Sequence, residues 1–209
     1  MTFFARAERA VLADALLAAG PDAPTLCEGW ATRDLAAHIV LRERRPDAAA
    51  GIALKSAAGH MRRVQDRLAA GDYPALVDRV RTPPLLLRPA FMEEAMNLVE
   101  FFIHTEDVRR ASGDWAPREL PADHERALAS WAGRSAKRSA RRFPARILVK
   151  TPGTEPLTVG PGEGEPALTI EGAPGELLMF FTGRQGAAAV EITGPDDLAE
   201  QLRGARLGI

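Results

Sequence analysis

The spacing of apolar residues changes once along this 209-residue chain, from the period of a helix to the period of a strand. Up to about residue 143, apolar side chains recur three or four positions apart, as at Phe4, Ala7 and Val11. Beyond that point, short segments such as "ARILVKT", "PLTVG", "PALTIEG" and "AAAVEITG" alternate apolar and polar residues between glycine and proline turns. The change predicts an α+β chain with a helical bundle domain over 1–143 and a small α+β domain over 144–209.

Two segments interrupt the strand-like part of the sequence. "PGELLMFFTGR" and "PDDLAEQLRG" each begin with proline and are expected to form short helices. In the helical part, we expect the longest helix to run from about Pro89 to about Ser112 and Gly113.

Composition narrows the class of protein and the kind of partner. The chain is 46% hydrophobic and 26% charged, which is typical of a soluble globular protein, and its formal net charge of -1 gives no reason to expect nucleic acid or a membrane as partner. No apolar run approaches the roughly 20 residues that span a bilayer, and charges interrupt the first helix, so no signal peptide is expected. Its single cysteine, Cys27, excludes an internal disulfide. We therefore expect a cytoplasmic protein.

Two polar residues stand out in the apolar helix "NLVEFFIHTEDVRRA". Glu100 and His104 lie four positions apart, so a helix places them on one face, one turn apart. His38, in the apolar segment "LAAHIVLRE", is the candidate for a third residue at the same point. Two imidazoles and one carboxylate are a ligand set that leaves a fourth position open on zinc, as in catalytic sites. The alternative is a solvated glutamate and core histidines bonded to carbonyl groups. Two further histidines, His60 and His124, are expected at the surface.

Two motifs resemble a known family. "LCEGWATRDLAAHIVLRERRPDA" (26–48) and "EFFIHTEDVRRA" (100–111) are similar to the metal-binding domain of the mycothiol-dependent maleylpyruvate isomerase family, in the DinB-like superfamily of four-helix bundles, and most similar to an actinobacterial subfamily. The resemblance implies a DinB-like four-helix bundle and a divalent metal held by His38, Glu100 and His104. Zinc is the expected ion, with nickel or another divalent ion as a replacement.

The same resemblance implies mycothiol as a co-substrate. A thiol that enters the open position of a zinc site is deprotonated, which supplies a thiolate at neutral pH. The implied activity is that of a thiol-dependent isomerase or a thiol transferase acting on a small electrophile. A non-catalytic module that binds metal and senses a ligand is the alternative.

Arginines follow His38 on its helix. Arg42 lies one turn further along the same face, and Arg45 lies close behind it. Either could hold a carboxylate of the substrate or of the thiol cofactor, although cations also suit a solvated helix end.

Two more residues near these motifs have alternative roles. Asp107, three positions after His104, could orient the imidazole or pair with Arg109 or Arg110. Cys27 could be a nucleophile, but no histidine lies near it in sequence and the trio is complete without it. We expect Cys27 to serve packing or loop geometry.

A basic run, "RSAKRSARRFPAR" (134–146), offers a rival function. Its arginines could form a face that contacts nucleic-acid phosphates, but their spacing also fits a solvated helix, and no helix-turn-helix or zinc-finger signature accompanies them. Nucleic-acid binding is therefore the weaker hypothesis.

Overall fold

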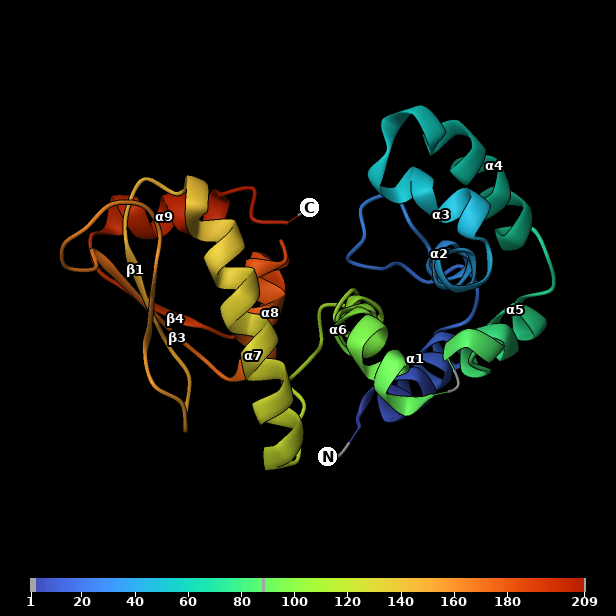
Figure 1. The fold of residues 1–209 in the computed structure, drawn as a ribbon, viewed down its shortest axis with the longest axis horizontal. Helices are drawn as coiled ribbons and strands as arrows, with labels where there is room; N and C mark the ends of the chain where they lie inside the picture. The colour runs from blue at the N-terminus through green and yellow to red at the C-terminus, as the bar shows by residue number, and fades with distance from the viewer. Residues whose placement is uncertain (1–2, 88, 209) are drawn as a thin grey trace. The chain divides into compact units, whose positions relative to one another are not determined.

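The computed structural model describes residues 3–87 and 89–208, and they form an α+β protein (Figure 1). The chain divides into two compact units, Met1–Trp115 and Ala116–Ile209. No helix of the described residues is long and apolar enough to cross a membrane.

The first unit is helical. Helices α1 and α6 pack along each other, α2 packs on α4, and α5 contacts both α1 and α2. Leu12, Leu16, Ile39 and Phe101 are fully buried in the core that these helices share. The helices of this unit are α1 (Ala5–Ala19), α2 (Thr32–Arg44), α3 (Pro46–Ala53), α4 (Ala58–Ala69), α5 (Tyr73–Arg81) and α6 (Ala90–Arg109), with 3-10 turns at Lys55–Ala57 and Leu85–Leu87.

Side-chain caps fix where two of these helices begin. At the start of α1, the Glu94 carboxylate of α6 accepts hydrogen bonds of 2.7 Å from the backbone N–H groups of Phe4 and Ala5. At the start of α2, Asp34 accepts a hydrogen bond of 2.9 Å from the N–H of Ala31. Because free N–H groups at a helix N-terminus need acceptors, these carboxylates stabilise the first turn of both helices, and α2 carries His38. The predicted long helix is confirmed as α6, which ends slightly before the expected residue.

The second unit packs helices on a four-stranded sheet of order β2-β1-β3-β4. Strands β1 and β3 are parallel, and the two outer strands run antiparallel to their neighbours. All four predicted strands and both predicted short helices are confirmed. The elements are α7 (Ala122–Ser139), β1 (Ile147–Lys150), β2 (Leu157–Val159), β3 (Leu168–Glu171), α8 (Pro174–Phe181), β4 (Glu191–Thr193) and α9 (Asp196–Gly204), with 3-10 turns at Ala140–Arg142 and Gln185–Ala187.

The boundary between the units differs from the predicted one after residue 143. Helix α7 belongs with the second unit because it packs against α8 and β2, where Leu128, Ala132 and Ala136 are buried. The spacing of apolar residues predicts that this segment is a helix, but it does not show which of the two units packs against the apolar face of that helix. The expectation that His124 lies at the surface is also wrong, since this residue of α7 is 4% exposed.

Candidate metal centre

Helices α2 and α6 bring the three predicted residues together. His38 lies in α2, and Glu100 and His104 lie one turn apart on α6. One ligand atom from each of the three side chains lies within 4.8 Å of the other two. The rings of His38 and His104 are 5.6 Å apart between centroids and nearly perpendicular. The group therefore has the composition and the spacing of a set of metal ligands.

The neighbours of the two histidines orient them. The indole ring of Trp30, in the loop before α2, lies 5.1 Å from the ring of His38. On α6, Phe101 and Phe102 are buried, so the helix is fixed in rotation and presents Glu100 and His104 towards α2. The side chain of Glu100 is 37% exposed and that of His104 is 10% exposed. The group thus opens to solvent on the side of Glu100.

The two ring nitrogens of His104 have different surroundings. Nδ1 lies 2.9 Å from Oδ2 of Asp107, whose side chain is fully buried. Nε2 lies 3.5 Å from Oε2 of Glu100. A carboxylate on the far ring nitrogen fixes the orientation of a metal-binding histidine and makes it more basic. Asp107 therefore takes the orienting position that its sequence spacing suggested, while Arg109 and Arg110 pair with Glu106.

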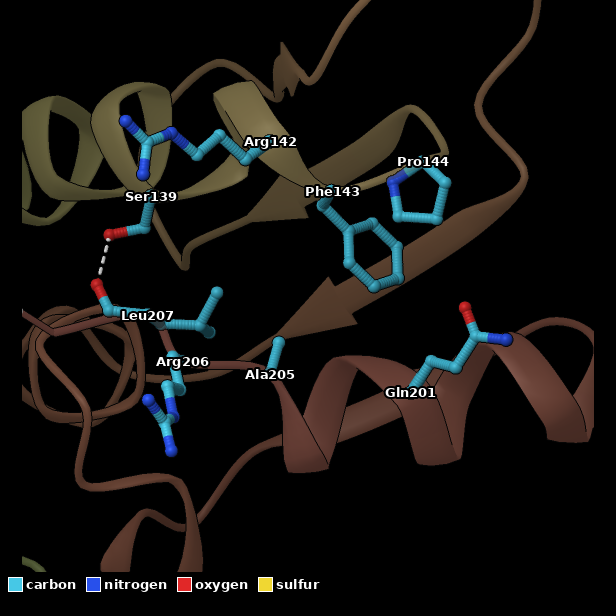
Figure 2. Close-up of a pocket in the computed structure, with 8 residues that line it drawn as sticks. All are labelled: Ser139, Arg142, Phe143, Pro144, Gln201, Ala205, Arg206 and Leu207. Carbon is cyan, nitrogen blue, oxygen red and sulfur yellow. Dashed lines mark hydrogen bonds between the residues drawn. The ribbon is translucent and has the colours of Figure 1, made fainter.

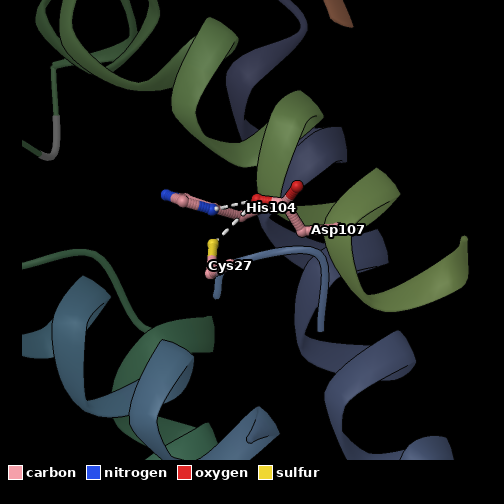
Figure 3. A group of neighbouring side chains, drawn as sticks. All are labelled: Cys27, His104 and Asp107. Atoms are coloured by element: carbon pink, nitrogen blue, oxygen red, sulfur yellow. Dashed lines mark hydrogen bonds and ion pairs between the residues drawn. The ribbon is translucent and has the colours of Figure 1, made fainter. Parts of the chain in front are cut away.

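Cys27 adds a second contact to Asp107. Its Sγ lies 3.2 Å from Oδ2 of Asp107, the same oxygen that faces His104 (Figure 3). Cys27, His104 and Asp107 therefore form a second group of side chains that could hold a metal. Cys27 was not predicted at this point, because 80 residues separate it from Asp107 and no local spacing joins them.

Ionisation distinguishes the three predicted residues. Burial lowers the pKa of His38 to about 4, and His104 contributes to the same shift, so His38 is neutral at pH 7 with a free electron pair. Burial alone would raise the pKa of Glu100, but its hydrogen bond to His104 and the charge of Arg42 hold it at about 2. Burial alone would lower the pKa of His104, yet hydrogen bonds to Asp107, Cys27 and Glu100 raise it well above its usual value. The surroundings of His104 therefore favour a positive charge at this point.

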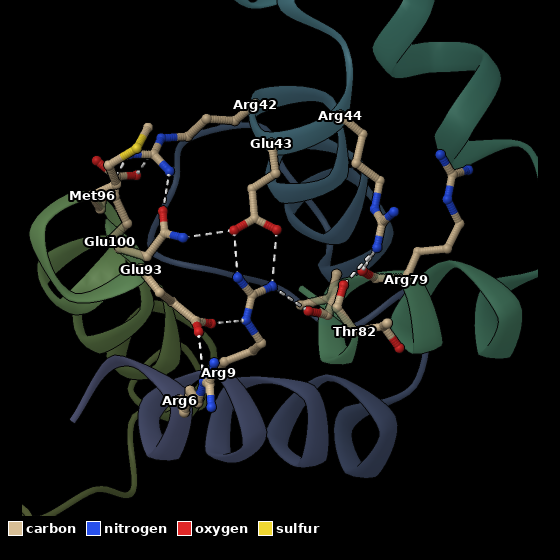
Figure 4. A network of polar contacts seen from close by, with 12 residues as sticks. Arg6, Arg9, Arg42, Glu43, Arg44, Arg79, Thr82, Glu93, Met96 and Glu100 are labelled. Atoms are coloured by element: carbon tan, nitrogen blue, oxygen red, sulfur yellow. Dashed lines mark hydrogen bonds and ion pairs between the residues drawn. The ribbon is translucent and has the colours of Figure 1, made fainter. Parts of the chain in front are cut away.

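The two arginines predicted to hold carboxylates differ in placement. Arg42 lies at the group, with Nε 3.7 Å from Oε2 of Glu100, and its terminal nitrogens donate to Oδ1 of Asn97 and the carbonyl of Met96 at 2.6 and 2.7 Å (Figure 4). Arg45 instead forms a partly exposed ion pair of 2.7 Å with Asp47. Of the pair, only Arg42 contacts the candidate ligands among the described residues.

A buried ionic network continues from Arg42 into the bundle (Figure 4). Asn97, which accepts from Arg42, donates to Oε1 of Glu43 at 2.7 Å. Glu43 binds both terminal nitrogens of Arg9, and the Nε of Arg9 donates to Glu93 at 2.6 Å. Arg9, Glu43 and Glu93 have side chains at most 2% exposed. This network was not predicted, because its only signal in the sequence is one charged residue on the apolar face of each of three helices.

Comparison of the chain with protein-family models, with curated proteins and with solved structures found no match. Function is therefore inferred from the geometry of the site and from the two motifs.

Proposed function

We propose that the chain binds one divalent metal ion, most suitably zinc, through His38, Glu100 and His104, and that the ion activates a low-molecular-weight thiol for attack on a small electrophile. The observation that carries this proposal is the arrangement around His104, whose Nε2 faces Glu100 while Asp107 occupies Nδ1. An imidazole arranged in this way presents one nitrogen to a metal and is oriented through the other.

The distances fit the size of a zinc ion. Zinc binds nitrogen and oxygen ligands at about 2.0–2.1 Å, so two ligand atoms in a tetrahedral site lie about 3.4 Å apart. His104 Nε2 and Glu100 Oε2 are already 3.5 Å apart, and His38 lies within the 4.8 Å that encloses the group. Small side-chain rotations would complete the site. The residues present therefore fit the metal that the motifs imply.

The group that contains Cys27 is the weaker metal site. The sulfur of Cys27 and the Nδ1 of His104 both hydrogen bond to the same oxygen of Asp107, at 3.2 and 2.9 Å. These atoms satisfy one another, and a metal among them would remove the contact that orients His104. We therefore assign Asp107 and Cys27 to the support of the site.

The open position on the metal and the charged residues beside it determine which chemistry the site could perform. A metal with three protein ligands supplies an open position at which a thiol loses its proton. Arg42 lies beside that group, and in this proposal it would hold a carboxylate of the thiol or of the electrophile through the N–H groups that its bonds to Asn97 and Met96 leave free. Glu100 is ionised and exposed on the open side, so incoming molecules approach past it. Together with the motifs, these features support a mycothiol-dependent isomerase or thiol transferase built on a DinB-like four-helix bundle.

Cobalt substitution tests the thiol-binding part of this proposal. We expect cobalt-loaded protein, titrated with mycothiol or with a small surrogate thiol, to develop a sulfur-to-metal charge-transfer absorption and to release about one proton per thiol bound. Arg42→Ala should retain the cobalt and weaken only partners that carry a carboxylate. Cobalt that occupies the site but whose spectrum no thiol changes would favour a metal-dependent sensing module instead.

A further inference from the structure

The basic run that the proposed function does not use is divided by the fold of the second unit. Arg134 stacks over the ring of Trp131 at 4.8 Å, and the Arg146 guanidinium donates to the carbonyl of Gly164. Arg138, Arg141 and Arg142, at the end of α7 and in the turn after it, instead line a hollow of about 620 Å³. The run is therefore a local cluster and not a continuous basic stripe.

The C-terminal segment adds a fourth arginine to this hollow. Arg206, which follows α9, lines it together with Leu207 and Gly208. The hydroxyl of Ser139 lies 2.7 Å from the carbonyl oxygen of Leu207, which ties the C-terminal segment to the end of α7 (Figure 2). The same hydroxyl lies 2.7 Å from the carbonyl oxygen of Phe181. Phe143 and Leu207 are each 5% exposed, so the backbone that carries the arginines is packed in place.

The four guanidinium groups lack anionic partners within the described chain. No side-chain ion pair or side-chain hydrogen bond joins Arg138, Arg141, Arg142 or Arg206 to the described residues, and none of the described residues that line the hollow is acidic. Arg9 in the first unit differs from these four, because its guanidinium has two carboxylate partners, Glu43 and Glu93. Four positive charges in one concavity repel one another, and a bound polyanion would offset that repulsion.

We propose that this hollow is a binding site for a compact ligand that carries two adjacent phosphate groups. A single carboxylate engages only one guanidinium fork, whereas a pyrophosphate group offers several negative charges and enough acceptor oxygens for several forks. A long polyanion such as a nucleic acid is disfavoured, because Arg134 stacks on Trp131 and Arg146 bonds to Gly164, so neither extends the basic cluster. A second hollow, of about 310 Å³, shares Ser139, Arg142, Arg206 and Leu207 with the first and leaves room for the organic group of such a ligand.

Titration calorimetry with inorganic pyrophosphate at fixed ionic strength tests this proposal. The parent protein should bind pyrophosphate, and the double variant Arg141→Gln/Arg206→Gln should bind it about tenfold or more weakly, since hydrogen bonds to charged groups are lost. The matched control is Lys137→Gln/Arg203→Gln, which removes the same charge from α7 and α9 outside the hollow and should change affinity by less than about threefold. The His104→Ala variant should bind pyrophosphate as the parent does, which separates this site from the metal centre.

Four results would overturn the proposal. The first three are a parent protein that does not bind pyrophosphate, an equal loss in the control double variant, and binding that disappears with His104→Ala. Citrate that binds as tightly as pyrophosphate would also overturn it, because a tricarboxylate would then satisfy the cluster equally well.

Discussion

The contact of Asp107 with His104 is the feature that best distinguishes a metal-binding histidine from an ordinary buried one. The Asp107 carboxylate contacts both His104 and Cys27, yet it is not in the proposed ligand set. Asp107→Asn keeps the size of the side chain and removes its charge, so we expect the fold to survive and metal affinity to fall by about 10- to 100-fold. Competition with a chelator measures the change.

The control for this variant is Asp78→Asn, an exposed aspartate of α5. It should leave the metal affinity unchanged. If Asp107→Asn bound metal as tightly as the control, Asp107 would not orient His104 for metal binding.

Cys27 is expected to support the site without reacting itself. Cys27→Ser replaces the thiol with a hydroxyl that can still donate to Asp107, so metal content and most thiol-dependent turnover should persist. Elemental analysis and an assay of thiol consumption with an electrophile decide this. Loss of turnover with metal and fold intact would instead make Cys27 a nucleophile.

At the scale of elements, helices α1, α2 and α6 are joined by the ionic network around Arg9. Arg9→Met would leave Glu43 and Glu93 buried without their main partner, and breaking a buried pair in this way costs about 3–5 kcal/mol. Urea denaturation of the metal-free protein should therefore give a free energy of unfolding that is about 3–5 kcal/mol lower for Arg9→Met than for the parent.

Arg6 provides the matched comparison, because it contacts the same Glu93 from a side chain that is 55% exposed. Arg6→Met should cost less than about 1 kcal/mol, since exposed ion pairs contribute little. Equal effects of the two substitutions would show that burial of the network does not determine its contribution.

Elements also show which parts of the structure could be predicted from the sequence. The strands and the short helices of the second unit were predicted because alternation and proline starts are local signals. The approach of His38 to Glu100 and His104 was predicted because polar residues are costly in an apolar helix and therefore indicate a shared site. The Arg9 network and the contact of Cys27 with Asp107 join residues far apart in sequence, so no local pattern could reveal them.

At the scale of the whole molecule, the two units have separate cores and carry separate candidate sites. The predicted boundary was wrong because α7 has the same helical period as the bundle, although its apolar face is covered by α8. The hollow at the end of α7 was missed for a related reason. Arg206 joins Arg138, Arg141 and Arg142 only because the C-terminal segment returns to Ser139.

The metal content of the protein shows whether His38, Glu100 and His104 bind an ion. Elemental analysis of the purified protein should find about one divalent ion per chain, and His38→Ala and His104→Ala should each lose it. His60→Ala is the control: this histidine contacts Asp47 outside the trio, so its variant should keep the ion. Parent protein without metal, or a His104→Ala variant that holds the ion as tightly as the parent, would contradict the assignment of His38, Glu100 and His104 as the metal centre.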